Sequence, residues 1–310
     1  MGRSIDDHRV AFDFEIAFSN GGGIKGWDFR LDIDGTDISD TALADYIVQD
    51  LRLLMVGSVK ILNKRIFQER HKRAAGHSPS GEGEGGATLV DLSHAVRDGQ
   101  TTYPGLPALA ITDHLSHLGS HGRYADGVSF QIGRIDMVAN SGTAIDAPYH
   151  RFPGMADVAE LPLSHIADLA GLVVRLGGMT GRAVTRQALL PALGDVAGSA
   201  VLIETGWSRR WETPGYFVDH PFLTQDAVEL LRDRQVALVG IDSLNIDDTG
   251  DPDRPAHSIL LAAGIPIVEN LTNLGDLPTR GFHFSAVPMR AVGMGAFPVR
   301  AWARLAKDRV

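Results

Sequence analysis

The sequence of 310 residues contains no cysteine, so neither a disulfide framework nor a thiolate metal site can form. A bound metal ion must therefore take its ligands from histidine, aspartate, glutamate or water, and hard or borderline cations suit such ligands. Long apolar runs are missing as well. The sequence has no run of about 18 apolar residues, which a membrane-spanning helix would need. The opening residues, MGRSIDDHRV, lack the apolar core of a signal peptide. We expect a cytoplasmic protein with no membrane partner.

Positive charge is in deficit, because 29 Lys and Arg residues face 38 Asp and Glu residues, giving a net charge of -9. An acidic surface repels nucleic acids and anionic membranes at long range, so we expect neither as a partner. Hydrophobic residues make up 44% of the chain, which is close to the average of globular proteins and enough for a sizeable core. The expected partner is a small-molecule substrate.

The first 72 residues have the pattern of a small domain. Apolar residues alternate with smaller or more polar ones in two runs, as in strands with one buried face: Phe12, Phe14, Ile16 and Phe18, then Trp27, Phe29, Leu31 and Ile33. Glycines in 19–23 allow a hairpin turn between the runs. Ser39 can cap a helix, and alternation returns at 59–61. We predict a β-β-α-β domain over residues 1–72, of unknown role.

Residues 73–87, RAAGHSPSGEGEGGA, are small, polar or glycine, which is typical of a flexible linker. Beyond the linker, 172–176, 200–203 and 236–241 are short apolar runs bounded by turn residues, as in buried strands. Helical patterns lie between them, and Thr224 is placed to cap one of these helices. The sequence therefore predicts a second domain of the α/β class with a mixed sheet, over residues 88–310.

An acid and an imidazole stand four residues apart in the segment 140–151, NSGTAIDAPYHR. Four steps of extended chain span roughly 13 Å, whereas a turn or helix brings the pair to roughly 6 Å. Pro148 suits the first position of a helix or turn and pushes Ala147 toward an extended conformation. A bend there would point Asp146 and His150 into one pocket. The alternative is that Asp146 only caps a helix and His150 lies on its surface.

A second polar cluster contains His257 and Glu269. Glu269 directly follows the apolar run 265–268, so it would stand at the end of a buried strand, where ligand sites commonly form. Alternatively, His257 is a core histidine and Glu269 a solvated strand end. Three more histidines lie in 113–121, DHLSHLGSH, whose composition suggests a loop. We expect this loop to serve as a substrate lid rather than to ligate metal.

Taken together, these residues resemble the cyclase family of metal-dependent hydrolases, which includes bacterial kynurenine formamidase and isatin hydrolase. The resemblance spans most of residues 88–305. The matching segments are 90–94, 103–105, 142–143, Asp146, Pro148, His150, 205–207, 240–243 and 257–269. The resemblance implies an α/β fold whose mixed sheet has a barrel-like β portion, here preceded by the small β-β-α-β domain. It also implies a homodimer or homotetramer.

The family signature is His-x-Gly-Thr-His-x-Asp-x-Pro-x-His. The resemblance implies that its two early histidines and the Asp bind metal, and that the last His, His150 here, serves in acid–base catalysis. Asn140 and Ala144 stand where the early histidines would be. Members with two ions hold the second through three residues that are all retained here, Asp146, His257 and Glu269. The resemblance thus implies one divalent metal, Zn²⁺ or Mn²⁺.

The leading hypothesis is a metal-dependent hydrolase of a small-molecule amide, lactone or cyclic imide. Metal-bound water would be the nucleophile, and His150 with Asp146 would be the catalytic residues that move the proton. The residues expected to contact substrate are Asn140, Thr143 and Trp207. Two alternatives stay open: a metal-independent cyclase or dehydratase that uses His150 and Asp146, and a non-catalytic ligand-binding protein with a degenerate site.

Overall fold

The computed structural model describes all residues except 1–7, 34–35, 51–52, 69–86, 126 and 307–310. The chain divides into two compact units, Met1–His77 and Ser78–Val310. The predicted linker, 73–87, lies outside the described residues apart from Ala87. None of the described helices is long and apolar enough to span a membrane.

The first unit has the element order β-β-α-β: β1 (His8–Phe18), β2 (Gly23–Ile33), α1 (Asp40–Asp50) and β3 (Val56–Gln68). The strands form one antiparallel sheet with β1 in the middle. Leu43 and Ile47 of α1 are fully buried and join the apolar cluster of this sheet. Ser39 caps α1, because its hydroxyl accepts a hydrogen bond from the N–H of Ala42 at 3.1 Å.

Trp27 departs from the predicted alternation, since it is 62% exposed. The register between β1 and β2 shifts there, so that Trp27 and Asp28 together lie opposite the single residue Asp13. Asp28 has a φ of 47°, and its N–H donates to the Asp13 carboxylate at 2.7 Å. Such a β-bulge adds one residue to a strand and re-aims the side chains beside it. The expectation that Trp27 faces the core is therefore wrong.

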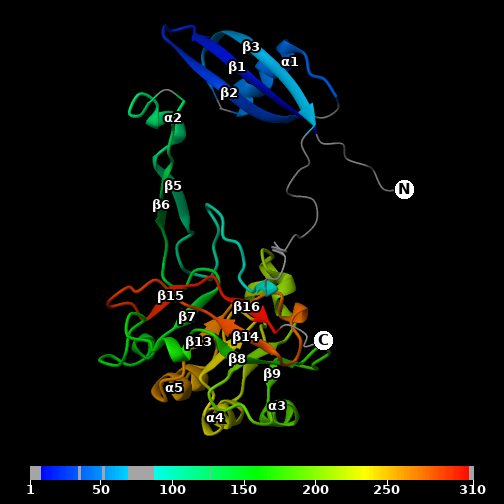
Figure 1. Ribbon diagram of the computed structural model, residues 1–310, viewed down its shortest axis with the longest axis vertical. Coiled ribbons are helices and arrows are strands. Elements are labelled where there is room, and N and C mark those ends of the chain that lie inside the picture. Colours follow the sequence, from blue (N-terminus) through cyan, green and yellow to red (C-terminus); the bar gives the residue numbers. More distant parts are fainter. Residues whose placement is uncertain (1–7, 34–35, 51–52, 69–86, 126, 307–310) are drawn as a thin grey trace. The chain divides into compact units, whose positions relative to one another are not determined.

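The second unit is built on a nine-stranded sheet in the order β15-β7-β13-β12-β10-β8-β14-β16-β4 (Figure 1). Its strands are β4 (Leu89–Asp91), β7 (Ala144–Asp146), β8 (Leu169–Arg175), β10 (Ala200–Glu204), β12 (Leu238–Ile241), β13 (Ile267–Glu269), β14 (Phe282–Ser285), β15 (Ala296–Pro298) and β16 (Trp302–Leu305). The neighbours β13, β12, β10 and β8 run parallel, and the outer strands pair antiparallel. The predicted α/β class with a mixed sheet is confirmed.

The two edges of this sheet lie close together, so the sheet curls into a half barrel. β15 forms one edge, and after Pro298 the chain reaches Trp302 in β16, next to the other edge. Four steps of chain span at most roughly 14 Å, which limits the distance between the edges. Ser93, just after β4, also forms a bridge with Leu271, just after β13. The barrel-like β portion expected from the resemblance is confirmed.

Three helices cover one face of the sheet: α3 (Arg186–Leu193), α4 (Gln225–Asp233) and α5 (Pro255–Ala262) (Figure 1). They share one apolar cluster with the central strands, and a second apolar cluster lines the inside of the curl. A short parallel pair joins β9 (Ala183–Val184) to β11 (Phe222–Leu223). Thr224 holds the N-cap position of α4, but its hydroxyl donates to the carbonyl of Val184 at 3.1 Å instead of capping the helix.

A two-stranded hairpin stands out from the sheet, formed by β5 (Ala110–Leu115) and β6 (Ile132–Asp136) with the short helix α2 (His117–Ser120) near its tip (Figure 1). The segment 113–121 is therefore not the loop that its composition suggests. Nearly every residue of both strands is exposed. A strand without a buried face leaves no apolar alternation in the sequence, which explains why the sequence does not predict these two strands.

Candidate active site

A cavity of about 280 Å³ lies where the second unit gathers its polar residues. Its lining includes His150, His257 and Glu269 together with Asn140 and Ala144. These residues come from segments far apart in the sequence: β7, the turn after it, α5 and the end of β13. The two polar clusters that the sequence shows separately therefore face one cavity.

The bend at Pro148 forms as the sequence predicts. Ala147 is extended, with φ −95° and ψ 163°, and Pro148 takes the first position of the 3-10 helix η1 (Pro148–His150). As a result, His150 Nε2 lies 4.0 Å from Asp146 Oδ1. Asp146 is buried and does not cap η1, because Ala147 holds the N-cap position and makes no side-chain cap bond. The alternative in which Asp146 only caps a helix is not observed.

Gly295 holds the bend from the other side. Its carbonyl accepts a hydrogen bond from the N–H of Ala147 at 2.8 Å. A Cβ added at this glycine would come within 2.6 Å of the Cα of His150 and 2.8 Å of its backbone nitrogen. Only a glycine therefore lets the segment before β15 approach the backbone of η1 so closely.

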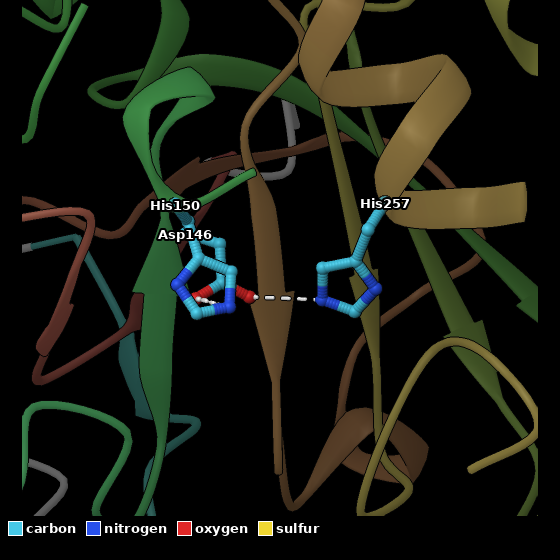
Figure 2. Close-up of side chains that lie close together, drawn as sticks. All are labelled: Asp146, His150 and His257. Carbon is cyan, nitrogen blue, oxygen red and sulfur yellow. Dashed lines mark ion pairs between the residues drawn. The ribbon is translucent and has the colours of Figure 1, made fainter. Parts of the chain in front are cut away.

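Asp146 lies between two imidazoles, as Figure 2 shows. Its Oδ2 is 3.5 Å from His257 Nε2, while Oδ1 faces His150. The ring centroids of the two histidines are 5.8 Å apart. One ligand atom from each of these three residues lies within 4.8 Å of the others, which is close enough for all three to bind one ion.

The orientation of His257 is fixed by Asp247, a residue that the sequence analysis did not select. His257 Nδ1 donates to Asp247 Oδ2 at 2.6 Å. The same carboxylate accepts the backbone N–H groups of Ala256 at 2.6 Å and of His257 at 3.0 Å. Because Nδ1 is engaged, Nε2 faces the cavity, where it lies 3.7 Å from Glu269 Oε1. A carboxylate behind a histidine in this way sets the tautomer and orientation that metal ligation needs.

The pKa values of His257 and of its neighbouring carboxylates depend on one another's charges. Burial alone would lower the pKa of His257, but hydrogen bonds to Asp146 and Asp247 and the charge of Glu269 raise it to about 10. Burial raises the pKa of Glu269 above its usual range, against the opposing effect of protonated His257. Three buried carboxylates thus surround one imidazole. The site carries an excess of negative charge, which a cation would neutralise.

The donor set fits one divalent cation. Asp146 and Glu269 offer two buried carboxylates, at 3.5 Å and 3.7 Å from Nε2 of the buried His257 imidazole. Asn140 and Ala144 line the same cavity, but they supply no imidazole there. The amide nitrogen of Asn140 instead donates to Asp146 Oδ1 at 3.4 Å. The residues present therefore suit one ion beside His257 and none at Ala144.

Thr143 and Trp207 do not line this cavity. Thr143 is buried, donates to the carbonyl of Asn270 at 2.6 Å and accepts the N–H of His94 at 3.1 Å. Trp207 donates from Nε1 to the carbonyl of Tyr216 at 2.9 Å. Thr143 thus lies behind the site, where it holds the backbone of the lining residue Asn270, and Trp207 lies outside the cavity lining. The three histidines of 113–121 are likewise absent from the cavity lining among the described residues.

Several site residues were given no role by sequence reasoning, among them Arg151, Asn245, Asp247 and Arg254. The last three lie in the polar run 242–254, which directly follows the buried strand β12. Side chains after the carboxyl ends of parallel strands commonly build ligand sites, and this argument had singled out Glu269 after β13. Applied to β12, it would have found these three as well.

Comparisons with known proteins cover the second unit. A family described as "Putative cyclase" matches residues 90–248. Kynurenine formamidase of Salinibacter ruber is 30% identical over 224 residues, which are 71% of this chain and 99% of that protein. Kynurenine formamidase of Sphingopyxis alaskensis is 28% identical over 223 residues, 69% of this chain and 96% of that protein.

The chain is similar to several solved structures, and two of them illustrate the likeness. One is described as a potential metal-dependent hydrolase with cyclase activity; it is 26% identical, covers 70% of this chain and 98% of its own, and has a TM-score of 0.58. The other is an isatin hydrolase bound to the product analogue thioisatinate, 21% identical, with a TM-score of 0.62 over 71% of this chain and 92% of its own. At that identity the second likeness shows the fold.

Proposed function

This chain belongs to the putative cyclase family, and we propose that it hydrolyses an amide, lactone or cyclic imide in a small molecule with the help of one divalent cation. The expectation of a hydrolase acting on amide C–N bonds is confirmed by the relatives named kynurenine formamidase. The observation that carries the finer proposal is the convergence of Asp146, His257 and Glu269 beside His150 in one cavity.

Three residues would hold the cation, Zn²⁺ or Mn²⁺: Asp146, His257 and Glu269. When bound, the cation lowers the pKa of a water ligand and polarises a substrate carbonyl. Asp247 keeps Nε2 of His257 directed at that position, and the N–H of Ile246 donates to Glu269 Oε1 at 2.8 Å. Both contacts fix the ligands before substrate arrives.

His150 serves as the acid–base residue. It is partly exposed at the cavity, and its Nε2 lies 4.0 Å from Asp146 Oδ1. His150 accepts a proton from the attacking water and then donates it to the leaving nitrogen or oxygen. Asn140 lines the cavity beside Asp146 and can donate to the substrate, whereas Thr143 supports the site through the backbone of Asn270.

The setting of this enzyme is part of the same proposal. Residues 88–310 form the hydrolase domain, and the small domain of residues 1–72 precedes it through the linker 73–87, which agrees with the two compact units. The family resemblance supports a homodimer or homotetramer. The location that we propose for the enzyme is the cytoplasm.

Metal analysis of purified protein without a metal-binding tag tests this function. We expect about one Zn or Mn per chain in the wild type and its loss in Asp146→Ala and His257→Ala. Hydrolysis of formanilide, a lactone and phthalimide is then followed before and after chelation. Metal-dependent turnover of one of them supports the proposal. Turnover that survives exhaustive chelation instead indicates metal-free acid–base chemistry by His150 and Asp146, an alternative that Ala144 at a signature metal position favours.

A further inference from the structure

Two guanidinium groups face the same cavity as the acidic cluster. Arg151 directly follows His150, and Arg254 directly precedes α5, which carries His257. Neither forms an ion pair with a carboxylate of the described residues. The charge of Arg254 lowers the pKa of the nearby Glu269, but neither guanidinium is held by a carboxylate contact, so both keep N–H groups for a ligand.

Arg254 is held in an unusual backbone conformation. Its φ of 48° and ψ of 60° lie in the left-handed region, directly before Pro255. A residue with a side chain seldom adopts this region, and a following proline disfavours α conformations further. Strained conformations of this kind persist where surrounding contacts fix them, and they concentrate at ligand sites. Here the conformation directs the arginine into the cavity.

Asn245 links Arg254 to the catalytic cluster. Its Oδ1 accepts a hydrogen bond from Arg254 Nη1 at 2.9 Å, and its Nδ2 lies 3.4 Å from Glu269 Oε2. The Arg254 guanidinium keeps its other N–H groups without a hydrogen-bond partner among the described residues. It is thus fixed in place by one bond and able to form more.

Arg151 stands at the more open side of the cavity. Its Nε donates to Ser258 Oγ at 3.4 Å, and its guanidinium lies 5.2 Å from the ring centroid of Phe152. Among the described residues, no hydrogen bond is made by its two terminal amino groups. A planar guanidinium with free parallel N–H groups binds a carboxylate through two hydrogen bonds.

With a divalent cation bound, the site would carry a net positive charge that one anion could neutralise. Three buried carboxylates, Asp146, Asp247 and Glu269, are opposed by the two guanidiniums and by the divalent cation that the site fits. The cation and the two guanidiniums together exceed the three carboxylates by one positive charge when both histidines are neutral. One carboxylate on the substrate would neutralise it.

We propose that the substrate carries a carboxylate group and that Arg151 and Arg254 bind it while the scissile bond lies at His150 and Asp146. This inference rests on the proposed function, because it takes the cavity as the place where substrate reacts. The cavity of about 280 Å³ is small among ligand pockets, so it suits a molecule of about one ring. The two arginines determine specificity and touch no reacting atom.

Binding of benzoate and benzamide tests the subsite without turnover. The two probes share ring and size and differ in charge. By calorimetry, in protein of equal and verified metal content, we expect benzoate to bind wild type about tenfold more tightly than benzamide, as a charge-assisted contact provides. Arg151→Gln and Arg254→Gln should each remove most of this preference. Arg186→Gln, at an exposed arginine of α3, should keep it.

Equal binding of the two probes to wild type would overturn the proposal. So would an unchanged preference in both arginine variants at full metal content, because the carboxylate would then bind elsewhere. Arg151→Gln alters an exposed side chain, so it provides the test even where Arg254→Gln does not fold, which thermal unfolding detects.

Turnover separates this inference from the proposed function. Formanilide and the three formamidobenzoate isomers share one scissile bond, and only the isomers carry a carboxylate. We expect at least one isomer to have a KM about tenfold below that of formanilide, with the difference lost in Arg254→Gln and kept in Arg186→Gln. Equal KM values with active enzyme overturn the subsite alone. Arginine-dependent benzoate binding without hydrolysis of any amide or lactone supports the subsite and contradicts the hydrolase.

Discussion

Asp247 Oδ2 lies 2.6 Å from His257 Nδ1, and this one contact determines which nitrogen of the imidazole reaches the cavity. Asp247 is fully buried and also accepts two backbone N–H groups at the start of α5. The helix and the ring are thus oriented by the same carboxylate.

Weakening this contact is expected to reduce metal affinity. In Asp247→Asn the side chain loses its charge and holds the His257 ring less firmly, so we expect a loss of about 10- to 100-fold in affinity for Zn²⁺ or Mn²⁺, as for other residues behind a metal ligand. Competition with a chromophoric chelator measures it. Asp248→Asn is the matched control, because Asp248 pairs with Arg182 and does not touch His257. Unchanged affinity in Asp247→Asn would show that Asp247 has no part in ligation.

A methyl group at position 295 should displace the acid–base histidine. Because the added Cβ of Gly295→Ala would meet backbone atoms of His150, η1 must shift. We expect kcat to fall about 100-fold, the order that a displacement of about 1 Å causes at a catalytic group, while the metal content stays near wild type. Gly177→Ala is the control, since nothing lies within 4 Å of a Cβ there. Equal kcat values in the two variants would contradict the close packing.

Acid should destabilise the protein through His94. Burial lowers the pKa of His94 to about 4, and its ring stacks on Trp211 with centroids 4.2 Å apart. The unfolded chain binds the proton at a pKa of about 6.5, so stability is present above that value and is lost as the pH falls toward 4. Between pH 7 and pH 5 this group alone removes about 2 kcal/mol from the free energy of unfolding.

Urea unfolding of wild type and His94→Phe at both pH values checks this expectation. Phenylalanine keeps the stack on Trp211 and removes the titrating group. The variant should therefore lose less stability than wild type on going from pH 7 to pH 5, by about 2 kcal/mol. An identical loss in both proteins would mean that other groups account for the acid sensitivity.

Restoring the family signature should add a second ion. The double variant Asn140→His, Ala144→His places two imidazoles at positions that already line the cavity. With Asp146 nearby, we expect the metal content to rise from about one to about two ions per chain, measured by elemental analysis. Asn140→His alone is the control and should stay near one. A double variant that folds but still binds one ion would show that the cavity wall is unsuited to a second site.

The local parts of the site were predictable from the sequence, because short-range rules govern them. The restriction that Pro148 imposes on itself and on Ala147 is enough to predict the bend that brings Asp146 to His150. The place of Glu269 at the end of a buried strand followed from the apolar run before it. These features depend on a handful of neighbouring residues.

The parts that were missed depend on long-range geometry. His257 meets Asp247 across a turn in which Arg254 takes a left-handed conformation that sequence rules disfavour. Thr143 appeared suited to bind substrate, yet its hydroxyl bonds to Asn270, 127 positions away in the chain. A hydroxyl can serve either role, and only the fold decides between them.

The segment from β15 to β16 completes the surroundings of the active site, and it is synthesised after the catalytic residues. The carbonyl of Gly295 accepts a hydrogen bond from Ala147, directly before η1, and the carbonyl of Met294 accepts one from Val158. The chain from Pro298 to Trp302 then connects one edge of the half barrel to the strand beside the other edge. These are the last strands of the described chain, whereas Asp146 and His150 are synthesised about midway. A nascent chain on the ribosome therefore exposes its catalytic residues long before they can be arranged. We therefore expect a fragment that stops before β15 to lack hydrolase activity, because Gly295 and the closure of the half barrel are missing from it.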